Sequence, residues 1–142
     1  HSQWDHGATS QDAKIRGLEA IRIHPHDAAA RNIADGGVVM VYNDRGRCLA
    51  GARVTDAVMP GVVVLPTGAP FEPEHPGVVG SLDTRGNPNV LTRDHGTSRL
   101  AQGASAQTCL VDIVRYVSGE SYDPLTNSGA ATDAASGTSW QV

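Results

Sequence analysis

The feature that most constrains the fold is a pair of β-prone runs separated by a short turn signal. The first run, VVMVYN, covers residues 38–43, and the second, RCLAGARVT, covers residues 47–55. Between them stands Asp44-Arg45-Gly46, which is typical of a tight turn because aspartate and glycine tolerate the backbone angles that such turns require. The two runs therefore predict an antiparallel β-hairpin.

Three further short runs have the same β-prone character. Apolar and polar residues alternate over residues 19–24, and valine-rich sequence marks residues 61–65 and 107–117, so each predicts a strand. After Pro25, the run AAARNI predicts a short helix with Asp27 at its N-cap or in its first turn. Aromatic residues make up only 4% of the chain and glycine occurs 16 times, which favours an aliphatic core in compact β structure with many turns. We therefore predict a mainly β fold with short helices, as a small barrel or a sandwich.

The chain divides into three predicted parts. Its 142 residues fit one domain with one hydrophobic core, and residues 19–117 hold all of the predicted strands. Residues 1–18 are polar and aperiodic, so we expect an extended N-terminal arm. Residues 118–142 are rich in serine, threonine, glycine and alanine, and we expect a flexible C-terminal tail unless something docks it. The proline-rich residues 67–88 predict a long irregular loop, and loops of this length are usually functional or disordered.

The charge and hydropathy patterns argue against two classes of partner. The net charge is −4, with mixed signs and no basic cluster, whereas a nucleic-acid-binding protein usually carries a basic stripe. No apolar run approaches the roughly 18 residues that a membrane-spanning helix needs, and no signal peptide is visible. We therefore expect neither nucleic-acid binding nor a membrane span.

The sequence lacks the motifs that mark most catalytic and metal sites. Cys48 and Cys109 stand in apolar runs without a CxxC partner, so we interpret them as buried free thiols. There is no HExxH, P-loop, GxGxxG or GxSxG motif, and we predict neither a catalytic residue nor a metal ligand in this chain. Asp94 and His95 would form an acid–base pair only in a small hydrolase, and a solvated loop pair is the simpler interpretation.

One polar stretch, residues 89–111, has the composition of a binding loop. It reads NVLTRDHGTSRLAQGASAQTCLV and is dense in amide and hydroxyl side chains. An amide offers a donor and an acceptor together, which suits the edge of a purine or pterin, and hydroxyls with loop N–H groups suit phosphate. The same side chains would equally serve to satisfy the backbone of a convoluted loop, and composition leaves both interpretations open. The candidate residues are Asn89, Thr92, Ser98, Gln102 and Gln107.

Four motifs, in this order along the chain, resemble a known family. They are HSQ, HPHDAAARNIADGGVVMVYNDRG, LAGARVTDAVMPGVV and NVLTRDHGTSRLAQGASAQTCLV, and the similarity runs from His1 to about Tyr116. The chain resembles the C-terminal molybdopterin-dinucleotide-binding domain of the dimethyl sulfoxide reductase family, in particular its trimethylamine-N-oxide and biotin sulfoxide reductase branch. The resemblance implies a double-psi β-barrel (aspartate-decarboxylase-like). It also implies that this is the last of four domains in a bacterial oxidoreductase whose bis(molybdopterin guanine dinucleotide) molybdenum cofactor reduces S- or N-oxides by oxygen-atom transfer.

The resemblance also implies which residues meet the cofactor. The first three residues match the family's His-Ser-Gln at the pterin, and Asn89 matches the asparagine of the NVLT motif that faces the cofactor. The implied cofactor-binding residues are His1, Ser2, Gln3, His6, Asn89, Thr92, Ser98 and Gln102. We expect the isolated domain to lack the cofactor and to be inactive alone. Its implied partners are the remaining domains of the parent oxidoreductase, and the surface that meets them would favour self-association of the isolated domain.

Two places depart from the family pattern. Residues 35–37 read D-G-G where the family has D-G-D, which should change only a turn. Residues 68–71 read G-A-P-F where the family has G-A-W followed by an aromatic residue, and the lost tryptophan bears on which oxide is the substrate. The sequence does not say whether the parent enzyme works in the bacterial cytoplasm or periplasm. The alternative to an enzyme domain is a free-standing double-psi barrel that acts as a small-ligand or protein-interaction module.

Overall fold

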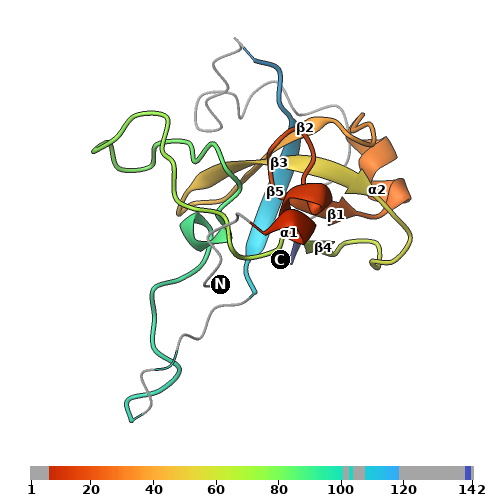
Figure 1. The fold of residues 1–142 in the computed structure, drawn as a ribbon. Coiled ribbons are helices and arrows are strands. Elements are labelled where there is room, and N and C mark those ends of the chain that lie inside the picture. Colours follow the sequence, from red (N-terminus) through yellow and green to blue (C-terminus); the bar gives the residue numbers. More distant parts are fainter. Residues whose placement is uncertain (1–6, 101–102, 104–107, 119–139, 142) are drawn as a thin grey trace, which may run out of the picture.

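The computed structural model describes residues 7–100, 103, 108–118 and 140–141, and it has mainly β structure with short helices (Figure 1). The helices are α1 (Ala8–Ala13), α2 (Pro25–Ala30) and the 3-10 helix η1 (Pro88–Val90). The strands are β1 (Ala20–Ile23), β2 (Val38–Tyr42), β3 (Arg47–Val54), β4 (Val63–Val64), β5 (Leu110–Arg115) and β6 (Trp140–Gln141). The five predicted strands are confirmed as β1 to β5, although β4 and β5 are shorter than predicted. No helix in the described residues is long and apolar enough to cross a membrane.

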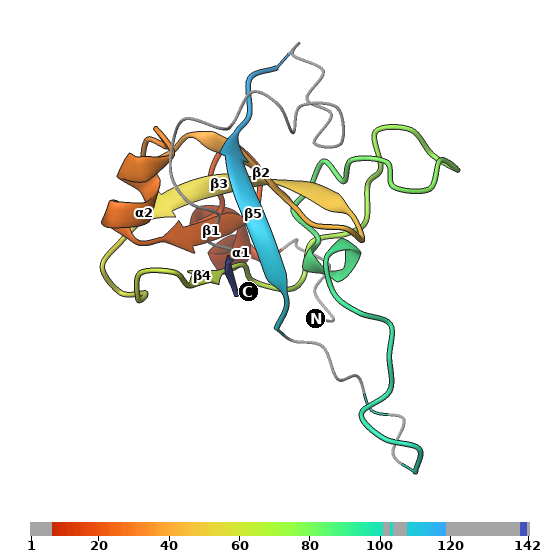
Figure 2. The ribbon, with the colours of Figure 1, turned by 180° about the vertical axis from the view of Figure 1, so that it is seen from behind.

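All six of these strands belong to one sheet, in the order β4-β1-β3-β2-β5-β6. The predicted hairpin is confirmed, because β2 and β3 pair antiparallel with Val39 opposite Ala50. β1 pairs parallel to β3 on the other side, and α2 lies in the connection between β1 and β2. Strand β5 crosses the hairpin at a steep angle in both views, so the sheet is strongly curled (Figures 1 and 2). The curl gathers the aliphatic side chains of the strands into one core.

The core is aliphatic, as the scarcity of aromatic residues predicts. The largest fully buried hydrophobic side chains include Ile21, Ile23, Met40, Leu91 and Ile113. Four of them come from strands. Burial of each such side chain stabilises the folded chain by roughly 1.5–3 kcal/mol relative to exposure in water. Leu91 is the exception, because it follows η1 and so fastens a loop to the core.

Helix α2 begins earlier than predicted. It starts at Pro25, and its N-cap is His24, whose imidazole accepts a backbone N–H two residues on at 3.2 Å. Asp27 lies in the first turn, which was one of the two predicted places, and it is buried. Its Oδ2 atom accepts the backbone N–H of Gly61 at 2.9 Å. Asp27 therefore ties the helix to the turn that leads into β4.

The arm predicted at residues 1–18 is not extended throughout, because α1 forms within it. A six-residue helix has less than two turns, so it leaves no hydrophobic period to detect in the sequence. Arg16 and Gly17 then adopt positive φ angles and turn the chain back. The side chain of Ile15 lies against Gly51 of β3 so closely that no Cβ would fit there. This contact docks the N-terminal segment on the sheet.

Strand β6 lies within the C-terminal tail predicted at residues 118–142, where it pairs with β5. Its two residues pair antiparallel to β5, with Val111 opposite Trp140 and Leu110 opposite Gln141. The edge of β5 that faces away from β2 offers backbone N–H and C=O groups, and such an edge readily takes up another strand. A two-residue strand has no detectable alternation, which is why the sequence did not predict it. Residues 119–139 lie outside the described residues.

Candidate functional site

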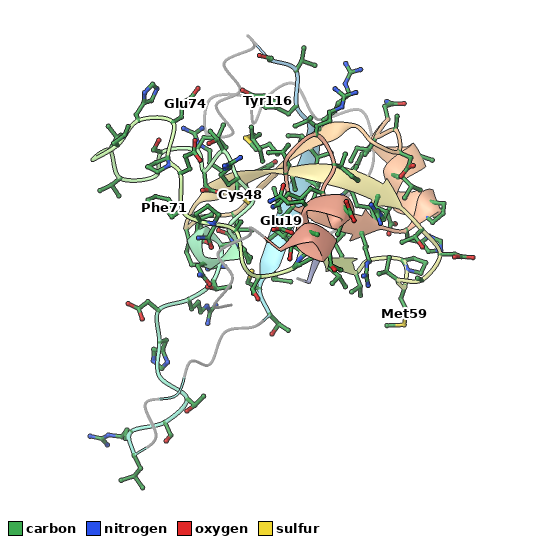
Figure 3. All side chains as sticks on the ribbon, viewed as in Figure 1. Glu19, Cys48, Met59, Phe71, Glu74 and Tyr116 are labelled. Atoms are coloured by element: carbon green, nitrogen blue, oxygen red, sulfur yellow. The ribbon has the colours of Figure 1, made fainter. Side chains whose placement is uncertain are left out.

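The candidate site centres on Asn89, which lies on η1. We call residues 83–91 the Asn89 turn. The turn lies beside the loop end of the β2–β3 hairpin, at the opposite end of the sheet from α2, in both ribbon views (Figures 1 and 2). Phe71 and Cys48 lie toward this end of the molecule, whereas Met59 lies at the α2 end (Figure 3).

The Asn89 turn is built around the carboxylate of Asp83, which is 0% exposed. Its Oδ2 atom accepts the backbone N–H groups of Arg85, Gly86 and Asn87 at 3.3, 2.8 and 2.7 Å. Its Oδ1 atom accepts the backbone N–H of Glu72 at 2.9 Å. Four N–H donors thus surround one carboxylate, which satisfies its acceptor capacity inside the protein.

The backbone of Asp83 also attaches the turn to the sheet. The Asp83 N–H donates to the carbonyl of Arg47 at 3.0 Å, and the Asp83 carbonyl accepts the N–H of Leu49 at 2.9 Å. Gly86 has a φ angle of 88°, and a Cβ there would lie 3.0 Å from the carbonyl oxygen of Leu49. Only glycine fits this combination of positive φ and close approach without strain.

The side chain of Asn87 links the Asp83 hydrogen bonds to the backbone of Asn89. The Asn87 side chain is buried, and its Oδ1 atom accepts the Asn89 N–H at 3.0 Å, which caps η1. The Asn89 carbonyl accepts the hydroxyl of Thr92 at 3.3 Å. The Asn89 side chain is exposed, and it forms no hydrogen bond with the part of the chain that the structure describes. Asn89 therefore combines a fixed backbone with an available amide.

The hairpin loop holds the other end of the turn. The carbonyl oxygen of Leu91 accepts from Asn43 Nδ2 at 2.9 Å and from Arg45 Nε at 2.7 Å. A Cβ at Gly46 would lie 2.5 Å from the carbonyl oxygen of Val90, so the hairpin loop and η1 are in direct contact. η1 is thus held from both sides, by Asp83 through Asn87 and by the hairpin loop.

The thiols near the turn are neutral, and Arg45 of the hairpin loop is in an ion pair. The Arg45 guanidinium pairs with the carboxylate of Asp44 at 2.9 Å. Burial raises the pKa of the Cys48 thiol, and the carboxylate of Asp83 raises it further. Burial also raises the pKa of Cys109, against the opposing effect of Arg45. Both cysteines are free, as predicted, and they stay protonated at neutral pH, but Cys48 alone of the two is buried, whereas Cys109 is half-buried.

The described residues of the stretch 89–111 fall into two differently held parts before Gly103. Residues 93–100, which we call the protruding segment, run away from the sheet (Figures 1 and 2). Ser98 lies there, exposed, and its hydroxyl oxygen accepts the N–H of Leu100 at 3.3 Å. The structure therefore brings Asn89 and Thr92 together and places Ser98 in a separate segment. The physical reason is that the sheet anchors the chain only up to Leu91.

Several predicted residues lie outside the described part of the chain. They are His1, Ser2, Gln3, His6, Gln102 and Gln107. Asp94 and His95 are both exposed on the protruding segment, which gives them no sheltered surrounding for acid–base chemistry. Within the described residues, no group of three or more His, Cys, Asp or Glu side chains is placed to hold a metal ion.

Sequence reasoning missed the residues that shape the turn. It treated residues 67–88 as an irregular loop, although Asp83 and Asn87 organise the end of that loop. A signal was present in D-T-R-G-N-P at residues 83–88, because Asp and Asn before Gly and Pro mark side-chain-capped turns. The roles of Asn43 and Arg45 had no such signal, since their acceptor at Leu91 is distant in sequence.

The two departures from the family pattern lie outside the helices and strands, the first at a turn and the second in the proline-rich loop. Asp35 Oδ1 accepts the N–H of Val54 at 2.8 Å, and Gly36 has a φ angle of 74°. A Cβ at Gly37 would lie 2.9 Å from the carbonyl oxygen of Ala34, so this turn is built for glycine. Phe71, the aromatic residue of the second departure, is exposed within the proline-rich loop (Figure 3).

The sequence profile of the molydopterin dinucleotide binding domain family matches residues 1–110. The chain belongs to this family. It is 47% identical over 116 residues to a dimethyl sulfoxide/trimethylamine N-oxide reductase of Cereibacter sphaeroides, covering 82% of this chain and 14% of the relative. It is 49% identical over 113 residues to a biotin sulfoxide reductase of the same organism, with 80% and 15% covered. It is 49% identical over 117 residues to trimethylamine-N-oxide reductase 1 of Escherichia coli K12, with 82% and 14% covered.

The domain thus spans only a small share of the length of these relatives. Among solved structures it is similar to acetylene hydratase from Pelobacter acetylenicus, with a TM-score of 0.51 and 18% identity. That match covers 78% of this chain and 16% of the hydratase chain. At this identity the likeness concerns the fold alone, and it agrees with a curled, mainly β domain.

Proposed function

We propose that this chain is the cofactor-binding C-terminal domain of a molybdenum oxidoreductase that reduces S- or N-oxides. The relatives named above are reductases of such oxides, and the domain family is named for molybdopterin dinucleotide. The single observation that carries the proposal is the exposed Asn89 amide on a backbone fixed from both sides. A prearranged amide loses little conformational freedom when it binds a ligand, and this favours binding.

The donor set of the Asn89 turn fits the organic part of the proposed bis(molybdopterin guanine dinucleotide) cofactor. The Asn89 amide offers one acceptor and two donors, which match the mixed edge of a guanine or a pterin. The guanidinium of Arg45 contacts the carbonyl of Leu91 and pairs with Asp44, and it would bind an anionic diphosphate by exchanging the Asp44 carboxylate for the phosphate oxygens. The described residues therefore suit ligand positioning.

The bound cofactor would supply the oxygen-atom transfer and the electrons that reduction of an oxide consumes. The contribution of this chain is to bind and orient that group through Asn89 and Thr92. By the family resemblance we also assign cofactor contacts to residues outside the Asn89 turn: His1, Ser2, Gln3, His6, Ser98 and Gln102. The remaining domains of the parent enzyme would complete the site.

The finer fold that we propose is a double-psi β-barrel. A ψ motif consists of two antiparallel strands that flank a third strand connected to one of them. β1 and β2 flank β3 in this way, since β3 is parallel to β1, antiparallel to β2 and joined to β2 by the hairpin loop. A second ψ motif and closure of the sheet would complete the barrel.

Calorimetry with guanosine diphosphate tests the proposed function, because this probe is the nucleotide half of the cofactor. We expect weak binding, with a Kd on the order of 1 mM, because much of the site belongs to other domains. Asn89→Ala should weaken binding about 5- to 30-fold through loss of one or two hydrogen bonds. Thr67→Ala, an exposed residue of the loop after β4, is the matched control and should bind as the wild type does. Absence of binding to the wild-type chain contradicts the proposal, and an unaffected Asn89→Ala variant contradicts the site.

A further inference from the structure

A buried carboxylate begins the Asn89 turn, and the proposed function assigns it no role in cofactor binding. Asp83 is 0% exposed, and within the described residues it forms no ion pair. Burial of an ionised carboxylate is costly unless hydrogen bonds compensate it. An apolar residue in the same place would leave four backbone N–H groups without their acceptor. The reason for a carboxylate at this position therefore lies in the backbone segments that its four hydrogen bonds hold in place.

A short series of contacts links Asp83 to the amide that we assign to the cofactor. The Oδ2 atom of Asp83 accepts three consecutive backbone N–H groups, and the last of them is that of Asn87 at 2.7 Å. The side chain of Asn87 then accepts the N–H of Asn89 at 3.0 Å. Asp83 is thus two hydrogen bonds away from Asn89, and both bonds end on backbone N–H groups that set the direction of the turn.

We propose that Asp83 is a positioning residue, which holds the Asn89 turn in the shape in which the Asn89 side chain meets the cofactor. This inference rests on the proposed function. Asp83 does not touch the cofactor, since its carboxylate is enclosed by the protein. Its effect on binding passes through Asn87 and the backbone of Asn89.

The isosteric Asp83→Asn substitution isolates this role. A carboxylate presents acceptors on both oxygens, whereas an amide has one acceptor and one donor group. The new NH₂ group must face either the N–H of Glu72 or the three N–H groups of the turn, and two donors then oppose each other. The side chain keeps its volume, so packing of the core around it is preserved.

Asp27→Asn is the matched control. Asp27 is 5% exposed, and its carboxylate also accepts a backbone N–H, that of Gly61 at 2.9 Å. It belongs to α2, at the opposite end of the sheet from η1 (Figures 1 and 2). A general loss of stability would appear in both variants, whereas loss of positioning would appear only in Asp83→Asn.

Amide hydrogen exchange of the full chain, followed by NMR, is the first test. In Asp83→Asn we expect the N–H groups of Gly86, Asn87 and Asn89 to exchange at least tenfold faster relative to the core strands. In Asp27→Asn these three groups should exchange as in the wild type, relative to the same strands. Unchanged exchange in Asp83→Asn, or an equal increase in both variants, overturns the inference.

Calorimetry with guanosine diphosphate is the second test. We expect Asp83→Asn to weaken binding at least fivefold, and to have no further effect in an Asn89→Ala background, because its influence passes through Asn89. Looser turn amides with unchanged affinity, or an equal loss in both backgrounds, overturn the positioning role while the proposed function stands. If the wild-type chain fails to bind the probe, the proposed function fails, and amide exchange alone decides whether Asp83 holds the turn.

A second variant keeps the inference testable if Asp83→Asn does not fold. Asn87→Ala removes only the last contact, the bond to the Asn89 N–H. We expect faster exchange of the Asn89 N–H and at least threefold weaker binding of guanosine diphosphate. Wild-type exchange and affinity in Asn87→Ala would show that the series of contacts from Asp83 does not position Asn89.

Discussion

The Asn89 turn and the protruding segment are neighbours in sequence and are both polar, but their backbones are held very differently. In the turn, the carboxylate of Asp83 and the side chain of Asn87 accept four of the backbone N–H groups of residues 85–89. In the protruding segment, the described contacts are local, such as the 2.9 Å bond from the Thr97 N–H to the Gly103 carbonyl. Polar side chains therefore make a preformed site only where buried acceptors and the sheet fix the backbone beneath them.

Two leucines show the same contrast in packing. Leu91 ends the Asn89 turn and is 0% exposed, whereas Leu100 ends the protruding segment and is 100% exposed. Leu91 joins the hydrophobic core with Val41 and Ile113. The turn is thus an extension of the core, and the protruding segment is not.

The largest difference in the free energy of unfolding should come from removal of one carboxylate in each region. Asp83→Ala leaves four buried N–H groups without their acceptor, and we expect a loss of about 3–5 kcal/mol in the free energy of unfolding. Asp94→Ala in the protruding segment should change it by at most about 0.5 kcal/mol. Urea denaturation measures both. Equal effects of the two substitutions would show that the two regions are held alike.

The paired leucines should give the next largest difference. Leu91→Ala removes a fully buried side chain, which costs about 2–5 kcal/mol through lost transfer energy and a cavity. Leu100→Ala removes an exposed side chain, so we expect a change within about 0.5 kcal/mol. Thermal unfolding of the two variants checks this. A destabilising Leu100→Ala would mean that the protruding segment packs against the domain in solution.

Two glycines test the close contact between the hairpin loop and η1. At Gly46 an added methyl group would meet the carbonyl oxygen of Val90 at 2.5 Å, and we expect Gly46→Ala to cost about 1–3 kcal/mol. At Gly103 the nearest atom among the described residues is the Thr97 hydroxyl at 3.7 Å, which is ordinary contact, so Gly103→Ala should be nearly neutral. Urea denaturation again supplies the measurement. A neutral Gly46→Ala variant would indicate that η1 moves freely away from the hairpin.

The smallest stability effect should come from the exposed amide itself. Asn89→Ala removes a side chain without a described hydrogen bond and should change the free energy of unfolding by at most about 0.5 kcal/mol. We expect the same of Ser98→Ala in the protruding segment. The two variants should nevertheless differ in guanosine diphosphate binding, with the larger loss in Asn89→Ala. A strongly destabilised Asn89→Ala variant would mean that Asn89 is a structural residue.

The hairpin and the other main strands were predictable because their signals are local: β-branched runs, turn residues and alternation over a few residues. Helix α1 and strand β6 were not, since each is too short to show a period. The family resemblance proposed Asn89 and Ser98 together, because both stand in one polar run, and it did not show that their backbones are held differently. The role of Asp83 depends on contacts with Arg47 and Leu49 of a distant strand, and no local pattern records them.

The most direct test of the proposed site is an NMR titration of the full ¹⁵N-labelled chain with guanosine diphosphate. It reports each backbone N–H separately and so compares the two regions in one experiment. We predict that the largest chemical-shift changes fall on residues 86–91, with smaller changes at residues 93–100. Changes confined to the protruding segment, or to strands remote from both regions, would contradict the assignment of cofactor binding to the Asn89 turn.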